Sequence, residues 1–348
     1  MKSICYMVLG AIVFWVGCAD VGGDAPEVVH AFYYWRGRFD IGVQEERALK
    51  HLNVRKLYVK FFDVDVGRDG EAVPLAVLQV AERVPDSIEV VPVVFITNRT
   101  LRGLGDAEVE RLARRIAVKV DERWGEISTG EMQELQLDCD WTERTRGQYF
   151  ALIRYLRKAI PERNCKLSAT IRLHQLKYAQ RTGVPPVARG MLMFYNVGDV
   201  EDYGVDNSIL DLAEAEKYLD ESTGYALPLD VALPIFRWGV LYRNGRMIKL
   251  INNLSMEDLG DSSRFEPLSE NRYEVLKSTY LNAYYLYRYD VIRLEAISAR
   301  QLQQAAEMLK PFLRKQDTTT LSLYHLSPAT LNHYEHESLQ AVFQSFSE

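Results

Sequence analysis

The segment ELQLDCDWTERT, residues 134–145, alternates polar and apolar side chains and carries two aspartates one residue apart. Successive side chains of a β-strand point to opposite faces of the sheet. One face carries the polar side chains Gln136, Asp138 and Asp140. The other carries the apolar side chains Leu135, Leu137, Cys139 and Trp141. The segment predicts a barrel strand over residues 134–141, with its apolar face against helices and both aspartates at the carboxyl-terminal mouth.

Seven further runs of apolar, β-prone residues precede or follow this segment. They cover residues 30–35, 56–62, 90–96, 166–173, 190–197, 230–236 and 321–326. Amphipathic helical patterns lie between several of them, for example at residues 105–127, with Asp106 as a candidate cap, and at residues 145–160. About eight such units favour a single (β/α)₈ TIM-type barrel, of the α/β class, over two doubly wound domains. No glycine-rich phosphate loop follows the first strand, which also disfavours the doubly wound fold.

The spacing between the seventh and eighth predicted strands predicts an insertion. Residues 237–253 predict a hairpin that turns at Asn244-Gly245, and the tyrosine-rich tract 280–290 has helical spacing, which predicts a helix with packed tyrosines. The strand-like run 290–297 competes with 321–326 for the eighth position in the barrel. We prefer 321–326, because helical patterns then precede it at 298–313 and follow it at 327–346.

Composition limits the classes of partner. The chain has 348 residues, of which 47% are hydrophobic, so it is too apolar to be disordered. It contains 42 Lys and Arg residues against 48 Asp and Glu residues, and it has no dense basic cluster. We therefore expect no nucleic-acid partner. The histidines show no paired ligand spacing, so no metal site and no cofactor are expected.

The first residues have the layout of an export signal. Residues 1–17 contain one lysine followed by an apolar stretch of about 14 residues, which is too short to span a bilayer comfortably. The sequence WVGC resembles a bacterial lipoprotein cleavage box in which Cys18 is lipidated, although Trp15 stands where leucine is usual. An ordinary secretion signal is the alternative interpretation.

This interpretation divides the chain into a signal peptide (1–17), a lipidated tether (18–27) and a barrel domain (28–348). It predicts a location in the bacterial cell envelope, with an acyl anchor in a lipid bilayer. Cys139 and Cys165 lie on neighbouring predicted strands, and the sequence leaves open whether they form a disulfide.

The ends of the other predicted strands bring further candidate residues to the same mouth. The fifth and sixth strands contribute Arg172, His174, Tyr195 and Asn196, and the first, third, seventh and eighth contribute Trp35, Asn98, Trp238 and Tyr324. Aromatic rings beside carboxylates suit a carbohydrate, which stacks its C–H faces on rings and hydrogen-bonds through its hydroxyls. Two neighbouring carboxyls can divide the acid and base roles of glycoside hydrolysis. In the alternative interpretation, Arg172 and His174 are only counter-ions for buried aspartates.

The sequences LDCDW (137–141) and MFYN (193–196) together resemble the chitinase-like barrels of glycoside hydrolase family 18. The fourth strand of that family carries Asp-x-Asp-x-Glu, and its sixth strand carries Met-x-Tyr followed by Asp or Asn. The chain from residue 18 onward also resembles the bacterial domain of unknown function 3142, a glycosidase-like barrel family.

The chain departs from the family 18 pattern at the proton donor. If Asp138 and Asp140 match the two family aspartates, Thr142 stands at the donor position and the nearest glutamate is Glu143. If Gln136, Asp138 and Asp140 fill the three inward positions, Asp140 is the donor. We prefer the second alignment, because it keeps all three side chains on the inward face. The usual glutamate is missing in both.

Two functions follow from the resemblance. The first is an envelope-anchored glycoside hydrolase acting on an oligo- or polysaccharide, with Asp140 as acid, Asp138 stabilising positive charge and Tyr195 positioning the sugar or its acetamido group. The second is a catalytically inactive glycan-binding lipoprotein of the same fold. The missing glutamate favours the binding protein, and the clustered polar side chains favour the enzyme.

Overall fold

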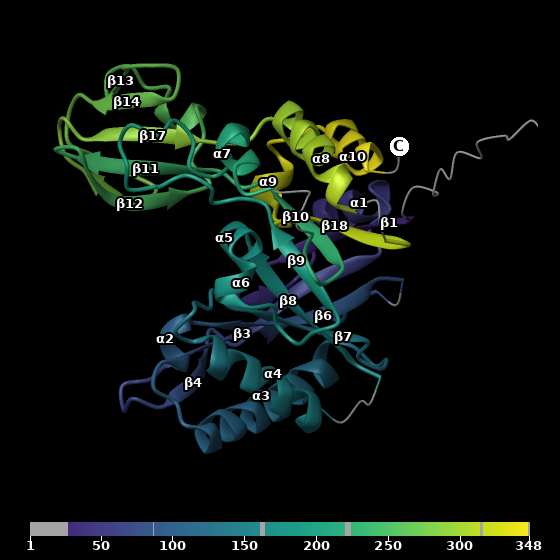
Figure 1. The fold of residues 1–348 in the computed structure, drawn as a ribbon. Helices are drawn as coiled ribbons and strands as arrows, with labels where there is room; N and C mark the ends of the chain where they lie inside the picture. The colour runs from purple at the N-terminus through teal and green to yellow at the C-terminus, as the bar shows by residue number, and fades with distance from the viewer. Residues whose placement is uncertain (1–26, 86, 161–163, 220–223, 314–315, 347–348) are drawn as a thin grey trace, which may run out of the picture.

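A closed barrel of parallel strands forms the centre of the molecule (Figure 1). The computed structural model describes residues 27–85, 87–160, 164–219, 224–313 and 316–346. The barrel closes because β18 pairs with β1 and β1 pairs with β3. Its strands are β1 (Glu27–Tyr34), β3 (Lys56–Val66), β6 (Glu89–Ile96), β7 (Glu134–Asp138), β8 (Lys166–Arg172), β9 (Arg189–Met193), β10 (Leu229–Pro234) and β18 (Thr318–Tyr324). Each overlaps one predicted run, so the prediction of a single (β/α)₈ barrel is confirmed.

Helices cover the outside of the barrel (Figure 1). Between β1 and β10 they are α1 (Val43–His51), α2 (Asn98–Leu101), α3 (Asp106–Ile127), α4 (Arg146–Ala159), α5 (Leu173–Lys177), α6 (Ala179–Thr182) and α7 (Leu212–Glu216). Near the C-terminus they are α8 (Ala299–Leu313), α9 (Pro328–Leu331) and α10 (His336–Ser345). The tract 327–346 therefore forms two helices rather than the one that its pattern predicts.

Helices α3 and α4 pack side by side and bury the apolar stripes that their sequences predict. In α4, Tyr149 and Ile153 are fully buried. The predicted cap of α3 is displaced by one residue, since Gly105 is the N-cap and Asp106 is the first helical residue. The backbone N–H of Gly105 donates to the Glu108 carboxylate, 2.8 Å away, which satisfies one of the amides left open at a helix start.

The connection between β3 and β6 differs from the other barrel connections. Apart from residue 86, which the structure does not describe, it contains the short strands β4 (Ala72–Leu75) and β5 (Gln79–Val80) and no helix. β4 runs antiparallel to the end of β3, and β5 pairs with β2 (Arg38–Phe39). The outer wall of the barrel is therefore covered at this point by an extended hairpin.

The insertion follows β10 and forms a separate sheet at one end of the molecule (Figure 1). Its strands are β11 (Trp238–Arg243), β12 (Arg246–Asn252), β13 (Phe265–Pro267), β14 (Arg272–Val275) and β17 (Val291–Glu295), with the 3-10 helix η1 (Glu257–Leu259) after β12. The predicted hairpin at Asn244-Gly245 is confirmed, and both turn residues have positive φ. Because β17 belongs to this sheet, 321–326 is the correct choice for the eighth barrel strand.

The helix predicted for the tyrosine-rich tract is wrong. Residues 279–286 form a hairpin of β15 (Thr279–Leu281) and β16 (Tyr284–Leu286). Asn282 and Ala283 both have positive φ, so the chain reverses between the strands. Tyr280 and Tyr285 pair across the hairpin and are 67% and 44% exposed, so these tyrosines are not the core residues that helical spacing suggests.

A fully buried ion pair joins the insertion to the barrel. The Nε of Arg293 donates to the Glu295 carboxylate at 2.6 Å, and neither side chain is exposed. Arg293 also donates to the backbone carbonyls of Asp202 and Val205, both 2.7 Å away. The other carboxylate oxygen of Glu295 accepts from the indole of Trp238 at 2.9 Å. The pair therefore fixes the loop after β9 and the first residue of the insertion sheet together.

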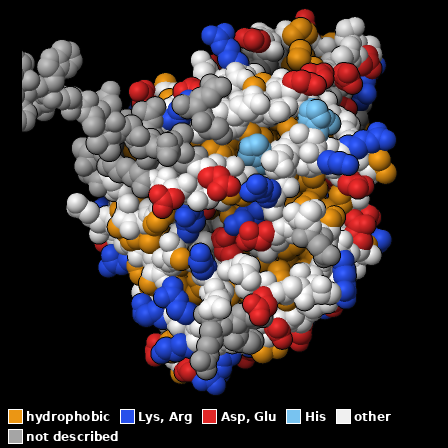
Figure 2. All heavy atoms as spheres, turned by 90° about the vertical axis from the view of Figure 1, so that its right-hand side faces the viewer, with side chains coloured by type: hydrophobic (Ala, Val, Ile, Leu, Met, Phe, Trp, Pro, Cys, Tyr) orange, Lys and Arg blue, Asp and Glu red, His pale blue; other side chains and the backbone are white. Residues whose placement is uncertain are grey.

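The face of the molecule in Figure 2 carries charges of both signs. Lysine and arginine side chains are interspersed there with aspartate and glutamate side chains, and hydrophobic side chains lie between them. No single sign of charge dominates this face.

We expect Arg293→Met to lower the free energy of unfolding by about 3 to 5 kcal/mol, because it leaves the buried Glu295 without its counter-ion. The double variant Arg293→Met, Glu295→Gln should lose less free energy of unfolding than the two single variants lose together, because the two side chains are coupled. Urea unfolding measures both. Arg246→Met, at an exposed position in β12, is the matched control and should change stability little. Simple additivity of the Arg293 and Glu295 changes would contradict the coupling.

Candidate active site

Successive side chains of β7 point to opposite faces of the sheet, and this determines where the predicted carboxyls lie. Gln136 is fully buried inside the barrel, where its side-chain oxygen accepts a hydrogen bond from Tyr33 at 2.5 Å. Trp141, on the opposite face, stacks on Tyr149 of α4 with ring centroids 5.0 Å apart. The strand ends at Asp138, three residues earlier than predicted, so Asp140 lies in the segment that leaves the barrel. The two aspartates therefore occupy different depths of the mouth.

Arg172, the last residue of β8, bonds to both aspartates. Its Nε lies 2.5 Å from an Asp140 oxygen, and one terminal nitrogen lies 3.2 Å from Asp138 Oδ1. The same Asp138 oxygen accepts from the Thr170 hydroxyl at 2.6 Å. One guanidinium thus holds the two carboxyls on the same side of the mouth.

The two carboxyls have unlike surroundings. The Asp138 side chain is 4% exposed, whereas that of Asp140 is 55% exposed. Burial raises the pKa of Asp138, and Arg172 and the Thr170 hydrogen bond partly offset the rise. A protonated Asp138 therefore costs less free energy than a protonated carboxyl in water.

Aromatic rings line the mouth next to these carboxyls. Tyr195, two residues after β9, is buried, and its ring centroid lies 5.4 Å from that of Tyr324 at the end of β18. Burial raises the pKa of Tyr195, so its hydroxyl keeps its proton and can donate a hydrogen bond. Trp35 follows β1 and lies 5.7 Å from Tyr324, and Trp238 begins the insertion sheet.

Two depressions open at the mouth and share Arg172, Tyr195 and Asn196. The first has a volume of about 530 Å³ and is lined by Asp138 together with Trp35, Trp238 and Tyr324. The second has a volume of about 370 Å³ and is lined by Asp140 and His174. The structure therefore gathers nine of the ten predicted catalytic and substrate-binding residues around these two depressions.

Asn98 is the exception. It is the first residue of α2, and its side-chain oxygen accepts from the Thr145 hydroxyl at 2.6 Å. It lines neither depression. Its described contact ties α2 to the start of α4. His174, predicted at the end of a strand, instead lies in α5, where burial lowers its pKa although Asp140 opposes the shift.

Glu143, the donor of the less favoured alignment, points elsewhere. Its carboxylate lies 3.4 Å from Arg181, and it lines a third depression of about 900 Å³. Thr142 and His174 line both this depression and that of Asp140, so the two lie side by side. Glu143 is absent from the lining of the cavity around Asp138.

The sequence did not single out Lys60 or Asp63, which line the 530 Å³ cavity together with His325. Simple alternation places Lys60 and Asp63 on opposite faces of β3. In the structure, the ladder between β3 and β6 shifts between Lys60 and Phe62, and the Lys60 ammonium lies 2.9 Å from the Asp63 carboxylate. Such an irregularity adds a residue to one strand, which brings both side chains to the inner face.

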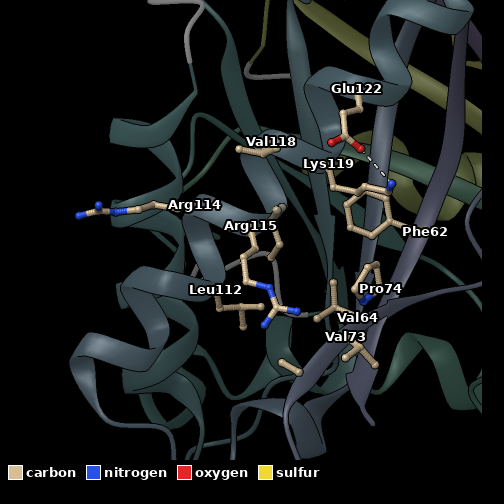
Figure 3. Close-up of a pocket in the computed structure, with 12 residues that line it drawn as sticks. Phe62, Val64, Val73, Pro74, Leu112, Arg114, Arg115, Val118, Lys119 and Glu122 are labelled. Carbon is tan, nitrogen blue, oxygen red and sulfur yellow. Dashed lines mark hydrogen bonds and ion pairs between the residues drawn. The ribbon is translucent and has the colours of Figure 1, made fainter.

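An apolar groove of about 380 Å³ lies outside the barrel, between α3 and the β3–β4 hairpin (Figure 3). Phe62 and Val64 face Leu112 across it, and Lys119 on the rim pairs with Glu122 at 2.9 Å. It contains none of the predicted site residues. The groove lies where the connection between β3 and β6 supplies a hairpin in place of a helix.

Cys139 and Cys165 do not form a disulfide. Glu134 pairs with Lys166, so Cys165 lies before the start of β8, whereas Cys139 follows the end of the parallel strand β7. Along the strand direction, Cys165 and Cys139 are therefore six residue positions apart, which corresponds to roughly 20 Å. Burial raises the pKa of the Cys139 thiol.

The described residues contain no cluster of three or more His, Cys, Asp or Glu side chains arranged to hold a metal ion. None of their helices is both long enough and apolar enough to span a bilayer. The predicted signal peptide and Cys18, together with nearly all of the tether, fall in residues 1–26, outside the described residues.

Solved structures with the same barrel come from several organisms. The spore cortex-lytic enzyme SleL of Bacillus megaterium QM B1551 has a TM-score of 0.52 and 9% identity, over 94% of this chain and 75% of its own. A group IV chitinase of Ostrinia furnacalis has a TM-score of 0.52 and 11% identity, over 92% and 100%. A family 18 N-acetylglucosaminidase of Paenibacillus barengoltzii has a TM-score of 0.51 and 12% identity, over 91% and 99%.

At these identities the likeness shows a shared fold. No protein-family model matches the chain, and no curated protein matches it. The resemblance to domain of unknown function 3142 therefore stays a prediction, and the chain has the barrel architecture of chitinase-type glycoside hydrolases.

His325 gives the mouth a testable dependence on pH. Burial lowers its pKa to about 4, and the charge of Arg36 acts in the same direction. The unfolded residue has a pKa of about 6.5, so between these values the unfolded chain binds a proton that the folded chain does not. Stability from this group is present above pH 6.5 and is lost as the pH falls toward 4.

Between pH 7 and pH 4.5, we expect the free energy of unfolding of the native protein to fall by about 2 kcal/mol more than that of His325→Gln. Urea unfolding at pH 7, 5.5 and 4.5 measures the difference. His51→Gln, at an exposed position of α1, is the control and should leave the native pH dependence unchanged. Identical pH profiles for the native and His325→Gln proteins would show that His325 does not titrate in this range.

Proposed function

We propose that the chain acts on an oligo- or polysaccharide at the barrel mouth, as a glycoside hydrolase-like protein that uses carboxylate acid–base chemistry. The observation that carries the proposal is the pair of unlike carboxyls at the mouth. Asp138 is buried and Asp140 is exposed, and both bond to Arg172. Glycoside hydrolysis uses two carboxyls placed close together at the scissile bond, and here one arginine holds two carboxyls at the mouth.

The roles follow from depth in the mouth. Asp140 lies at the solvent edge, where it can reach the oxygen of a glycosidic bond and act as the acid. Asp138 lies deeper, and its ionised form, which Arg172 and the Thr170 hydrogen bond favour against burial, would stabilise the positive charge that develops on the sugar ring. Tyr195 keeps its proton and would donate a hydrogen bond that positions the sugar or its acetamido group.

The aromatic wall supports a carbohydrate ligand. Trp35 and Trp238 are both partly exposed in the cavity beside Asp138, and the Trp238 indole is held by its hydrogen bond to Glu295. Rings fixed in this way can stack on the C–H face of a sugar at little cost in side-chain entropy. Asn196 adds an exposed amide for hydroxyl groups.

Glycan binding without cleavage is the second candidate function. Asp140 is one methylene shorter than the glutamate of the family 18 signature, so its carboxyl reaches less far into the cavity. The Nε of Arg172 lies 2.5 Å from this carboxylate, so the side chain is already engaged in an ion pair. These two features favour a binding protein of the same fold.

If Asp140 is the acid, Asp140→Asn should lower turnover of a cleaved glycan by roughly 10² to 10⁴-fold and leave binding intact. The change removes the transferable proton but keeps the size and hydrogen-bonding capacity of the side chain. Asp138→Asn should also lower turnover, because it removes charge stabilisation. Initial rates and titration calorimetry on a glycan panel measure turnover and binding separately.

Glu143→Gln is the matched control, since Glu143 faces Arg181 and the neighbouring depression. It should have a small effect on turnover. Loss of activity in this variant, with activity retained in Asp140→Asn, would establish the other alignment. If the native protein cleaves no glycan but binds one, and Trp35→Ala or Trp238→Ala weakens binding, the binding function is correct.

We also propose that Cys18 carries lipid and holds the protein in the bacterial cell envelope. The support is the sequence pattern of residues 1–18 alone. An acyl chain contributes about 0.8 kcal/mol per buried CH₂, and several chains give stable anchoring. Cys18→Ala should therefore move the protein from the membrane fraction to the soluble fraction. A native protein that fractionates as wholly soluble, or mass spectrometry that shows an unmodified Cys18, would contradict the anchor.

A further inference from the structure

The third depression, next to the mouth, is built by loops from three successive barrel strands. The loop after β6 contributes Arg102, the loop after β7 contributes residues 142–145, and the segment after β8 contributes His174 and Arg181. Its volume of about 900 Å³ exceeds that of either depression at the carboxyls. Thr142 and His174 line both this depression and that of Asp140, so a substrate that lies across Asp140 would lie next to it.

The charge of this depression is strongly one-sided. Its lining contains the three arginines Arg102, Arg144 and Arg181 and a single acidic residue, Glu143. Arg181 pairs with Glu143 at 3.4 Å. Arg102 and Arg144 are exposed, and neither has an ion-pair partner among the residues that the structure describes.

This arrangement contrasts with the rest of the molecule. The chain as a whole has a net charge of −6, and the face in Figure 2 mixes charges of both signs. Other exposed arginines, such as Arg111 and Arg154, also have no ion-pair partner among the described residues. The depression differs from them because it is concave and gathers three arginines in one lining. Two guanidinium groups without partners, in a concave site, leave several N–H donors available to an anion.

We infer that this depression is a subsite for a negatively charged substituent, a carboxylate or a sulfate, on the glycan that occupies the mouth. The inference rests on the proposed function and names its substrate class as an acidic glycan. Guanidinium groups bind such oxyanions through paired, charge-assisted hydrogen bonds. A nucleic-acid backbone fits the site less well, because it requires a longer track of cations than one depression supplies.

Titration calorimetry on the purified protein tests the subsite with three forms of one tetrasaccharide. The first carries uronic acid carboxylates, the second has these carboxylates reduced to neutral hydroxymethyl groups, and the third is the reduced form bearing sulfate esters. We expect at least one charged form to bind about tenfold more tightly than the neutral form at low salt. The comparison of carboxylate with sulfate identifies the preferred anion. This advantage should shrink at high salt, because the site is open to solvent.

The double variant Arg102→Gln, Arg144→Gln should lose the preference for the charged form and bind the neutral form as the native protein does. The matched control is Arg111→Gln, Arg154→Gln, which removes two exposed arginines of α3 and α4 that lie outside the depression. It should keep the preference, which separates a local subsite from an effect of net charge.

Equal affinity of the native protein for all three forms would overturn the subsite and leave the proposed function standing. A preference that the control variant loses as fully as the test variant would also overturn it. So would a DNA oligonucleotide that displaces the charged tetrasaccharide and binds more tightly through the same two arginines. If no glycan binds in this assay or in the wider panel, both the subsite and the proposed function are wrong.

Discussion

The guanidinium of Arg172 is the contact on which the barrel mouth depends. A carboxyl as deeply buried as Asp138 is costly unless a cation and hydrogen bonds accompany it, and Arg172 and Thr170 on the neighbouring strand supply both. The same guanidinium reaches outward to Asp140, which lies beyond the last residue of β7. One side chain therefore sets the relative position of two carboxyls with different exposure.

The burial of this contact also shapes its chemistry. Desolvation raises the pKa of Asp138, while the arginine and the Thr170 hydroxyl limit the rise. Asp140 stays in contact with solvent and with the same cation. Hydrolysis and simple binding draw on the same set of contacts, and the difference between them rests on whether Asp140 acts as an acid toward the bound glycan.

The buried ion pair between Arg293 and Glu295 likewise fixes neighbouring segments in place, at the edge of the site. Arg293 and Glu295 lie in the insertion sheet, yet their contacts run to the loop after β9 and to the indole of Trp238. The wall that carries Trp238 is thereby fixed to the barrel. The mouth is bounded on this side by a rigid element, whereas the arginine-lined depression is bounded by loops after β6, β7 and β8.

The sequence by itself determined the barrel and most of its mouth. Each barrel strand could be found from its own residues, because parallel strands that are buried on both faces form short apolar runs such as 90–96. The stretch 134–141 also alternates polar and apolar residues. The same alternation placed Gln136 and Asp138 inward, and strand order then brought Arg172, Tyr195, Trp35 and Tyr324 to one end. Parallel strands share their carboxyl ends, so these residues meet without further information.

Only the tertiary structure decided the features that depend on contacts between distant segments. Lys60 and Asp63 reach the same cavity because of an irregular pairing between β3 and β6, which no local pattern encodes. The tyrosines of the tract 280–290 have helical spacing as a set, but a turn with positive φ and a partner strand place Tyr280 and Tyr285 in a hairpin. Arg102, Arg144 and Arg181 are scattered in the sequence, and their depression exists because three loops converge where parallel strands end. Local periodicity determines elements, whereas loop conformation and pairing between elements determine which charges become neighbours.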